Sequence, residues 1–125
     1  MKLVLIAAGG ALGALLRYGA TGLVHGRLGF AFPYGTLVVN VAGCLLLGVL
    51  MATLDTRWSL PAETRILATV GVLGAFTTFS TFGYETFELL REGSQGVALL
   101  NVGANVVLGV AAVAAGRWIV LAIAG

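Results

Sequence analysis

Four neutral polar side chains stand inside long apolar stretches of the sequence, where a polar group is costly unless it finds a partner or serves a function. Asn40 follows Thr36 by one helical turn, and Asn101 and Asn105 have the same i, i+4 spacing. That spacing places each pair on one face of a helix. Amides and hydroxyls donate hydrogen bonds without carrying charge. The pairs therefore predict either a line of donors for a small anion or hydrogen bonds between neighbouring helices.

A second polar group is the run TTFST at residues 77–81, whose members all have low helix propensity. We expect a helix to break there, between about residues 74 and 80. At membrane depth, backbone that leaves helical geometry must be satisfied by protein or line a polar cavity. Carbonyls freed near Gly74 and Thr77 can coordinate a hard cation. The hydroxyls of Ser80 and Thr81 supply hydrogen-bond donors.

Two phenylalanines accompany this run. Phe79 and Phe82 are three residues apart and share a face if one helix contains both. An aromatic ring has a negative face and a positive edge, so ring edges turned inward stabilise a small anion without a full positive charge. Binding of that kind is weak enough to let an ion leave as well as enter. The same spacing also suits an aromatic pair that packs in the core or against lipid.

Charged residues are scarce within the apolar stretches. Arg17 is close enough to a helix end to reach the interface as an anchor, or it biases a vestibule towards anions. Glu85 stands either at a solvated helix end or near one end of a pathway. Proton-coupled transporters generally carry a carboxylate or histidine in the pathway. His25 is expected in a solvent-exposed loop.

These residues are positioned by four apolar segments. The chain has 125 residues, 59% hydrophobic and 10% charged, with a mean hydropathy of +1.04, whereas a soluble domain is about a quarter charged. A membrane-spanning helix needs about 20 apolar residues. We therefore predict an all-α membrane protein with one domain and four transmembrane helices, of which the third is broken. The expected helices cover residues 3–24, 34–54, 62–90 and 96–120, and Trp58 is an expected interfacial residue.

Four spans place both termini on one side of a membrane, so lysines and arginines indicate the orientation. The terminal side carries Lys2, Arg57, Arg65 and Arg117, and the other side carries Arg27 and Arg91. This bias is weak, which predicts insertion in both orientations and assembly as an antiparallel, dual-topology homodimer. Four short helices also enclose a polar pathway poorly, so a homo-oligomer is expected on that ground too.

Other classes of protein find little support. The sequence has no cluster of metal-ligating side chains, no nucleophile paired with a base and no phosphate-binding loop, so an enzyme is not expected. It has no basic block of the kind that binds nucleic acid.

Three stretches together resemble the Fluc family of fluoride channels, also called CrcB: GGALGALLRY at residues 9–18, PYGTLVVNVAGCLLLG at 33–48 and GVLGAFTTFSTFGYET at 71–86. The resemblance implies a multi-pass protein of the bacterial cytoplasmic (inner) membrane. It further implies an antiparallel homodimer with two fluoride pores and a structural sodium ion at its centre. Fluoride would flow passively down its gradient, protecting the cell from fluoride that accumulates as the acid.

By motif position, the resemblance implies a role for most of the residues above. Gly74 and Thr77 would provide backbone carbonyls for sodium, and Phe79 and Phe82 would be the pore aromatics. The remaining pathway residues would be Asn40, Ser80, Thr36, Thr81, Arg17 and Glu85. The fourth helix departs from the family pattern, because Asn101 and Asn105 stand where many members have an aromatic or other polar residue and then a serine or threonine.

Two alternatives remain at this stage. A small dual-topology multidrug exporter has a similar length and charge bias, but it needs a carboxylate in its first helix, where this chain has Arg17. A non-conducting accessory subunit of a larger complex would leave the expected break at TTFST unexplained.

Overall fold

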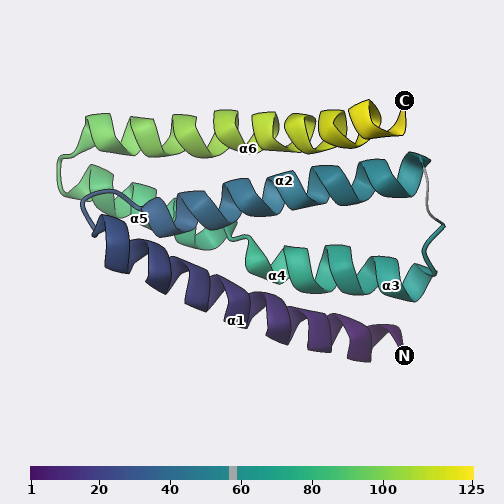
Figure 1. Cartoon of the computed structure of the whole chain (residues 1–125). Coiled ribbons are helices and arrows are strands. Elements are labelled where there is room, and N and C mark those ends of the chain that lie inside the picture. Colours follow the sequence, from purple (N-terminus) through teal and green to yellow (C-terminus); the bar gives the residue numbers. More distant parts are fainter. Residues whose placement is uncertain (57–58) are drawn as a thin grey trace.

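The computed structural model describes residues 1–56 and 59–125, so Arg57 and the expected interfacial Trp58 lie outside the described residues. The elements in chain order are α1 (Lys2–Leu28), α2 (Tyr34–Thr56), α3 (Ala62–Ile66), η1 (Leu67–Leu73), α4 (Gly74–Phe76), α5 (Phe79–Arg91) and α6 (Gln95–Ala124). Within the described ranges every regular element is a helix, which confirms the predicted all-α class. Both termini lie at the same end of the molecule (Figure 1).

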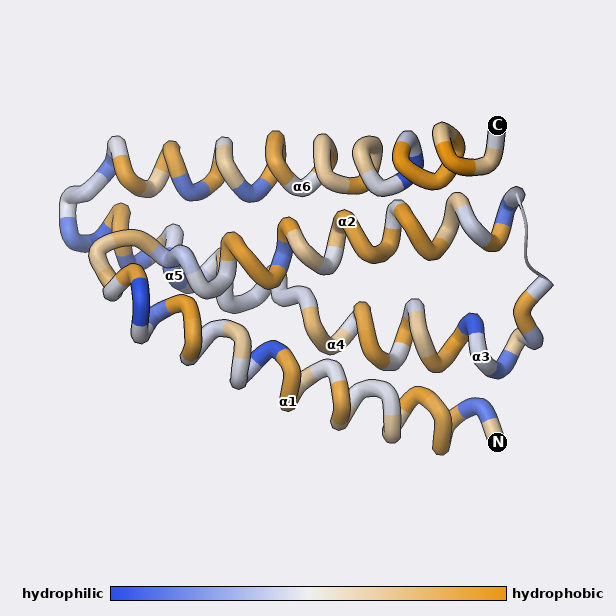
Figure 2. The backbone as a smooth tube through the Cα atoms, viewed as in Figure 1, coloured by the Kyte–Doolittle hydropathy of each residue, from blue (hydrophilic) through white to orange (hydrophobic). Residues whose placement is uncertain are grey.

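Among the described residues, four helical segments are long and apolar enough to cross a membrane, as predicted: Lys2–Leu28, Tyr34–Thr56, Ala62–Arg91 and Gln95–Ala124. Hydrophobic residues run along most of α1, α2 and α6, and hydrophilic residues lie at both ends of the molecule, along α5 and at a few places within the other helices (Figure 2). This distribution suits a lipid environment, because lipid tails cover apolar side chains while the ends meet water and headgroups.

The first helix is longer than predicted, and this corrects the position of His25. His25 lies in the last turn of α1, together with Arg27, and not in a loop. The helix ends at Gly29, whose φ is 75° and whose N–H donates to the His25 carbonyl at 2.9 Å. A positive φ favours glycine, and basic side chains are favourable near a helix C-terminus. The helix therefore continues through the polar residues His25 and Arg27 and ends only at Gly29.

The third segment changes geometry several times. The π-helical η1 follows α3, and α4 leads to Thr77 and Thr78, whose backbones are extended with φ/ψ of −83°/158° and −149°/113°. The sequence predicts a break over residues 74–80; the extended residues are these two threonines, whereas Gly74 and Ser80 are helical. Thr78 then caps α5, because its Oγ1 accepts a hydrogen bond from the Thr81 N–H at 3.2 Å.

The helices pack in two main pairs, α2 against α6 and α1 against η1 and α4 (Figure 1). The α2–α6 pair approaches closely at two glycines. A Cβ on Gly48 would meet the Val113 carbonyl oxygen, and a Cβ on Gly116 would meet the Leu45 carbonyl oxygen and lie 2.8 Å from the Val49 nitrogen. Small residues at such crossings let the helix backbones touch.

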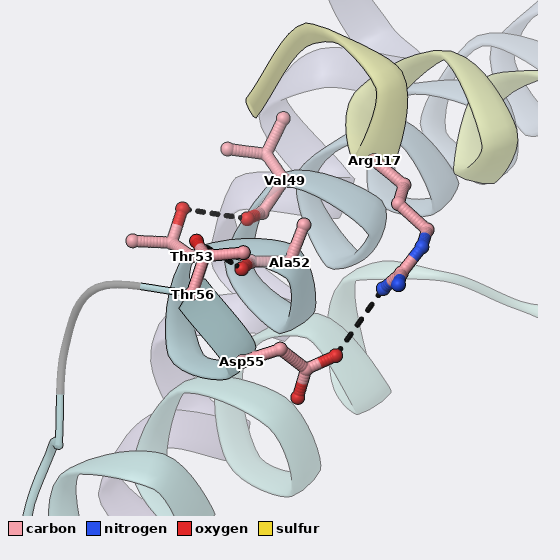
Figure 3. Close-up of polar contacts among 6 residues, drawn as sticks. All are labelled: Val49, Ala52, Thr53, Asp55, Thr56 and Arg117. Atoms are coloured by element: carbon pink, nitrogen blue, oxygen red, sulfur yellow. Dashed lines mark hydrogen bonds and ion pairs between the residues drawn. The ribbon is translucent and has the colours of Figure 1, made fainter. Parts of the chain in front are cut away.

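An ion pair joins the C-terminal parts of α2 and α6. Arg117 Nη1 lies 3.2 Å from Asp55 Oδ2, and the hydroxyls of Thr53 and Thr56 each donate at 2.8 Å to a backbone carbonyl one turn earlier (Figure 3). Both charged side chains are about half exposed, 54% and 53%. A pair of this exposure contributes about 0–1 kcal/mol, so close packing holds these helices more than charge does.

The close approach of α2 and α6 predicts that Gly116→Ala destabilises the protein. The added methyl group would overlap backbone atoms of α2, which cannot rotate away, so the helices must separate at a cost of about 1–3 kcal/mol. Gly103→Ala on the same helix is the matched control, since a Cβ there meets nothing within 4 Å. Thermal unfolding in detergent micelles measures both variants. Equal stability of the two would contradict this account of the pair.

Candidate functional site

Asn40 is the residue around which the interior polar groups are arranged. Its Nδ2 donates to the Thr78 carbonyl at 3.2 Å and to Asn105 Oδ1 at 3.0 Å, and its Oδ1 accepts from the Thr78 N–H at 2.8 Å. Thr78 is extended and buried, so both its backbone groups need partners from outside the helix. A side-chain amide offers a donor and an acceptor together. Asn40 thereby satisfies the backbone at the point where it leaves helical geometry.

The polar row continues along α6. Asn105 Nδ2 donates to the carbonyl and to Oδ1 of Asn101, both at 3.0 Å, and Asn101 Nδ2 donates to Thr86 Oγ1 at 3.0 Å. Asn101 is fully buried. The row therefore runs from α5 through α6 to α2, and hydrogen bonds within the protein use most of its amide protons. A bound anion would have to compete for these protons.

Thr36 and Glu85 form a second polar contact, on α2 and α5. Thr36 is buried, and its Oγ1 donates to Glu85 Oε1 at 2.8 Å. Glu85 Oε2 is buried and has no hydrogen-bond partner in the part of the chain that the structure describes. Glu85 is thus a half-buried interior group and not a solvated helix end.

Arg17 faces the same region. It lines a cavity of about 360 Å³ together with Thr36, Thr81 and Glu85. Arg17 is half-buried, and the ion pairs found among the described residues do not include it. The cavity consequently holds a cation and a carboxylate that do not neutralise each other by direct contact.

The two phenylalanines lie at a second cavity, of about 340 Å³, which Asn40, Gly74 and Thr77 also line. Their ring centroids are 5.5 Å apart with an interplanar angle of 53°. Phe82 is buried, whereas Phe79 is 83% exposed. Only one of the two rings is therefore enclosed within this chain.

Thr78 connects the two cavities, since it lines both. Its Oγ1 donates to Thr81 Oγ1 at 3.0 Å and lies 3.4 Å from Ser80 Oγ, and the Ser80 and Thr81 side chains are exposed. Sequence reasoning left Thr78 out of the candidate site. The available signal was its place before a restarting helix, where threonine is a preferred N-cap.

The structure thus brings the sequence candidates into two adjoining groups. Asn40, Gly74, Thr77, Phe79, Phe82 and Asn105 line the apolar-walled cavity, and Arg17, Thr36, Thr81 and Glu85 line the more polar one. Asn101 lies behind them in the hydrogen-bonded row, and Ser80 lines neither cavity. Neutral donors, aromatic rings and one uncompensated cation can hold a small anion. Four spans around such interior groups define a multi-pass integral membrane protein of the channel or transporter class.

Comparison with known proteins identifies the family. The model of the family described as CrcB-like protein, Camphor Resistance (CrcB), matches residues 4–117. A relative from Syntrophotalea carbinolica is 51% identical over 122 residues, which is 98% of each chain. One from Acidobacterium capsulatum is 45% identical over 113 residues, 90% of each chain. One from Dehalococcoides mccartyi is 46% identical over 118 residues, 94% of this chain and 91% of the relative.

This chain belongs to the CrcB family, which confirms the resemblance found in its sequence. All three relatives are named fluoride-specific ion channel FluC. The family is one of ion channels and not of enzymes, as the absence of a catalytic motif in the sequence predicted.

The contacts of Asn40 predict that Asn40→Ala destabilises the protein strongly. The variant leaves the N–H and the carbonyl of Thr78 without partners, at about 1–3 kcal/mol for each buried group. Asn105→Ala is the comparison variant, because it removes hydrogen bonds between side chains but leaves the Thr78 backbone paired. Thermal unfolding in detergent should show the larger loss for Asn40→Ala. An equal or smaller loss would refute the proposed role of Asn40 in holding Thr78.

Proposed function

We propose that this chain forms a fluoride-selective channel that lets fluoride leave the cell passively. One observation carries the proposal. Neutral hydroxyl and amide groups lie next to a phenylalanine pair, at the point where the backbone of Thr77 and Thr78 is extended. The names of the matched relatives, fluoride-specific ion channel FluC, agree with this activity.

Fluoride is small and strongly hydrated, so stripping its water is expensive. Selectivity then requires closely spaced donors and ring edges that together replace the hydration shell. The Thr36, Thr81 and Ser80 hydroxyls and the Asn40 amide are the proposed donors, and Asn101 and Asn105 hold Asn40 in place from α6. A larger halide would fit this spacing poorly.

The path in this proposal begins at the cavity of Arg17 and Glu85, passes Thr78 and reaches the ring of Phe82. Arg17 raises the local concentration of anions, because no ion pair with a described residue neutralises its charge. Glu85 lies near the same end. The described residues that line the cavity at Asn40 include no carboxylate and no histidine, which favours passive flow over proton coupling.

The functional unit in this proposal is an antiparallel homodimer of dual topology. Three observations support it. Phe79 is 83% exposed beside a cavity that its own chain does not close. A single set of four helices encloses a polar pathway poorly, and the charge bias between the two sides is weak. A second copy would cover Phe79 and complete the wall.

A structural sodium ion at the dimer centre is the next part of the proposal, held by the backbone carbonyls of Gly74 and Thr77. In a continuous helix these carbonyls would accept from the N–H groups of Thr78 and Thr81. Those N–H groups donate instead to Asn40 Oδ1 and to Thr78 Oγ1. Both carbonyls are thereby released at the wall of one cavity, and carbonyl oxygens suit a hard cation.

We further propose that the protein lies in the bacterial cytoplasmic membrane. Four helical spans suit that bilayer. Passive outflow there would relieve the toxicity of fluoride that enters a cell as the neutral acid.

A proteoliposome assay tests the activity. Liposomes that contain the purified protein and equal fluoride and chloride should release fluoride rapidly and chloride at the rate of protein-free liposomes. Replacement of sodium by a bulky organic cation should slow the fluoride release, because the released carbonyls would lose their ion. Chloride release as fast as fluoride release would refute the selectivity. Fluoride release that is unchanged after prolonged removal of sodium would refute the sodium site alone.

The ring of Phe82 provides a residue-level test. Phe82→Ile keeps an apolar side chain of similar bulk but removes the ring edge, so fluoride release should fall by about tenfold for a loss of about 1.4 kcal/mol. Phe87→Ile is the matched control on α5, since Phe87 is exposed and lines neither cavity. Size-exclusion chromatography should show the same assembly for both variants. Wild-type flux in Phe82→Ile would argue against the ring-edge role.

A further inference from the structure

Phe82 lies midway between two points at which other helices hold α5. Thr78 stands four residues before it and is bonded to Asn40 on α2. Thr86 stands four residues after it and is bonded to Asn101 on α6. Residues at this spacing share one face of a helix. The face of α5 that carries the buried Phe82 is therefore fixed one turn before the aromatic ring and one turn after it.

The two fixed points belong to one closed cycle of hydrogen bonds. Asn40 joins Thr78 to Asn105. Asn105 Nδ2 donates to Asn101 Oδ1 at 3.0 Å, and Asn101 Nδ2 donates to Thr86 Oγ1 at 3.0 Å. The backbone of α5 leads from Thr86 back to Thr78. Because connected hydrogen bonds strengthen one another, a change at one member of the cycle affects the others.

Thr86 completes this cycle, and the sequence did not single it out. Its Oγ1 accepts from Asn101 and donates to the Phe82 carbonyl at 2.8 Å. Threonine hydroxyls in helices often donate to a carbonyl one turn earlier, as those of Thr53 and Thr56 do (Figure 3). Among the described residues, Thr86 differs from these two by its second bond, which reaches another helix. One hydroxyl thus connects α6 to the backbone of Phe82.

The bond between Thr86 and Asn101 is difficult to replace. Asn101 is fully buried and Thr86 is half-buried. A buried amide that loses its acceptor must turn towards another one or remain unpaired, and both are costly. Because Asn101 Oδ1 accepts from Asn105, a turn of this amide would also disturb Asn105 and, through it, Asn40. The Thr86 hydroxyl therefore fixes the orientation of all three amides.

The orientation of Phe82 matters because an aromatic ring attracts an anion at its edge and repels it at its face. We propose that Thr86 is a positioning residue of the fluoride pathway, which acts through Asn101 to hold the Phe82 ring with its edge towards the ion. The inference rests on the proposed fluoride conduction and on the ring-edge role of Phe82. In this account α5 supplies the ring and α6 sets its position.

Fluoride release from proteoliposomes, measured at equal amounts of assembled protein, tests this role. Thr86→Val removes the hydroxyl and keeps a branched side chain, so release should fall about threefold or more, the effect of one lost hydrogen bond. Thr86→Ser keeps the hydroxyl and should release fluoride at the wild-type rate. Thr53→Val is the matched control, because it removes the same kind of bond within a helix from a half-buried residue that lines neither cavity of the site. It should keep the wild-type rate.

A combination with Phe82→Ile separates positioning from a purely structural effect. Thr86→Val should lower the release by the wild-type protein but should lower it no further in Phe82→Ile, where the ring is absent. The thermal unfolding temperature in detergent should fall by the same amount in both backgrounds, because both contain the bond to Asn101. A loss of release by the same factor in both backgrounds would make Thr86 purely structural and would overturn the proposal.

Thr86→Ala provides a second variant. Alanine also lacks the hydroxyl, and its helix propensity is the highest of all residues, so α5 should remain helical. Thr86→Ala should reproduce both results of Thr86→Val, and it takes the place of that variant if size-exclusion chromatography shows that Thr86→Val does not assemble.

Three further outcomes would overturn the role of Thr86 while leaving fluoride conduction intact: wild-type release in Thr86→Ala, an equal loss in Thr53→Val, or an equal loss in Thr86→Ser. Wild-type release in Phe82→Ile would remove the ring from the pathway, and the role of Thr86 with it. Absence of fluoride release from the wild-type protein would instead overturn the proposed function itself.

Discussion

The structure depends on one constraint, the need to pair the backbone of Thr78 where the third span is extended. In water an extended residue is solvated, but inside an apolar helical bundle its N–H and carbonyl must find protein partners. Asn40 provides both partners from α2, and Asn105 on α6 contacts Asn40 in turn. The same extended residues place Phe82 and Thr81 on a new helix. The cavity walls are consequences of this pairing.

This constraint also explains why the interior is polar but largely uncharged. Amides and hydroxyls satisfy a backbone at a small desolvation cost, whereas a charged group at the same depth requires a partner ion. The charged side chains of Arg17 and Glu85 line a separate cavity instead. In the proposed channel, charge therefore acts where an ion is admitted, and neutral donors act where its water must be replaced.

The sequence was sufficient for the four helical segments because hydrophobic length is a local property, and the spacing of Asn101 and Asn105 correctly indicated a shared face. The sequence was insufficient to predict which polar side chains form hydrogen bonds with one another. Thr36 and Glu85 are 49 positions apart and Asn40 and Thr78 are 38 apart, so no local pattern pairs them. His25 was misplaced because its polarity suggested a loop, although the helix continues until Gly29 provides a positive φ.

The contrast between Phe82 and Phe79 bears on the size of the functional unit. The two rings are in contact at 5.5 Å between centroids, yet one is buried and the other is 83% exposed. A lipid-facing phenylalanine would explain that exposure by itself, but this ring borders a cavity that the polar residues Asn40, Thr77 and Thr78 also line. Lipid tails cannot satisfy such groups. In the proposed homodimer the same region of a second copy would cover this cavity and would bring a second pair of rings to the path.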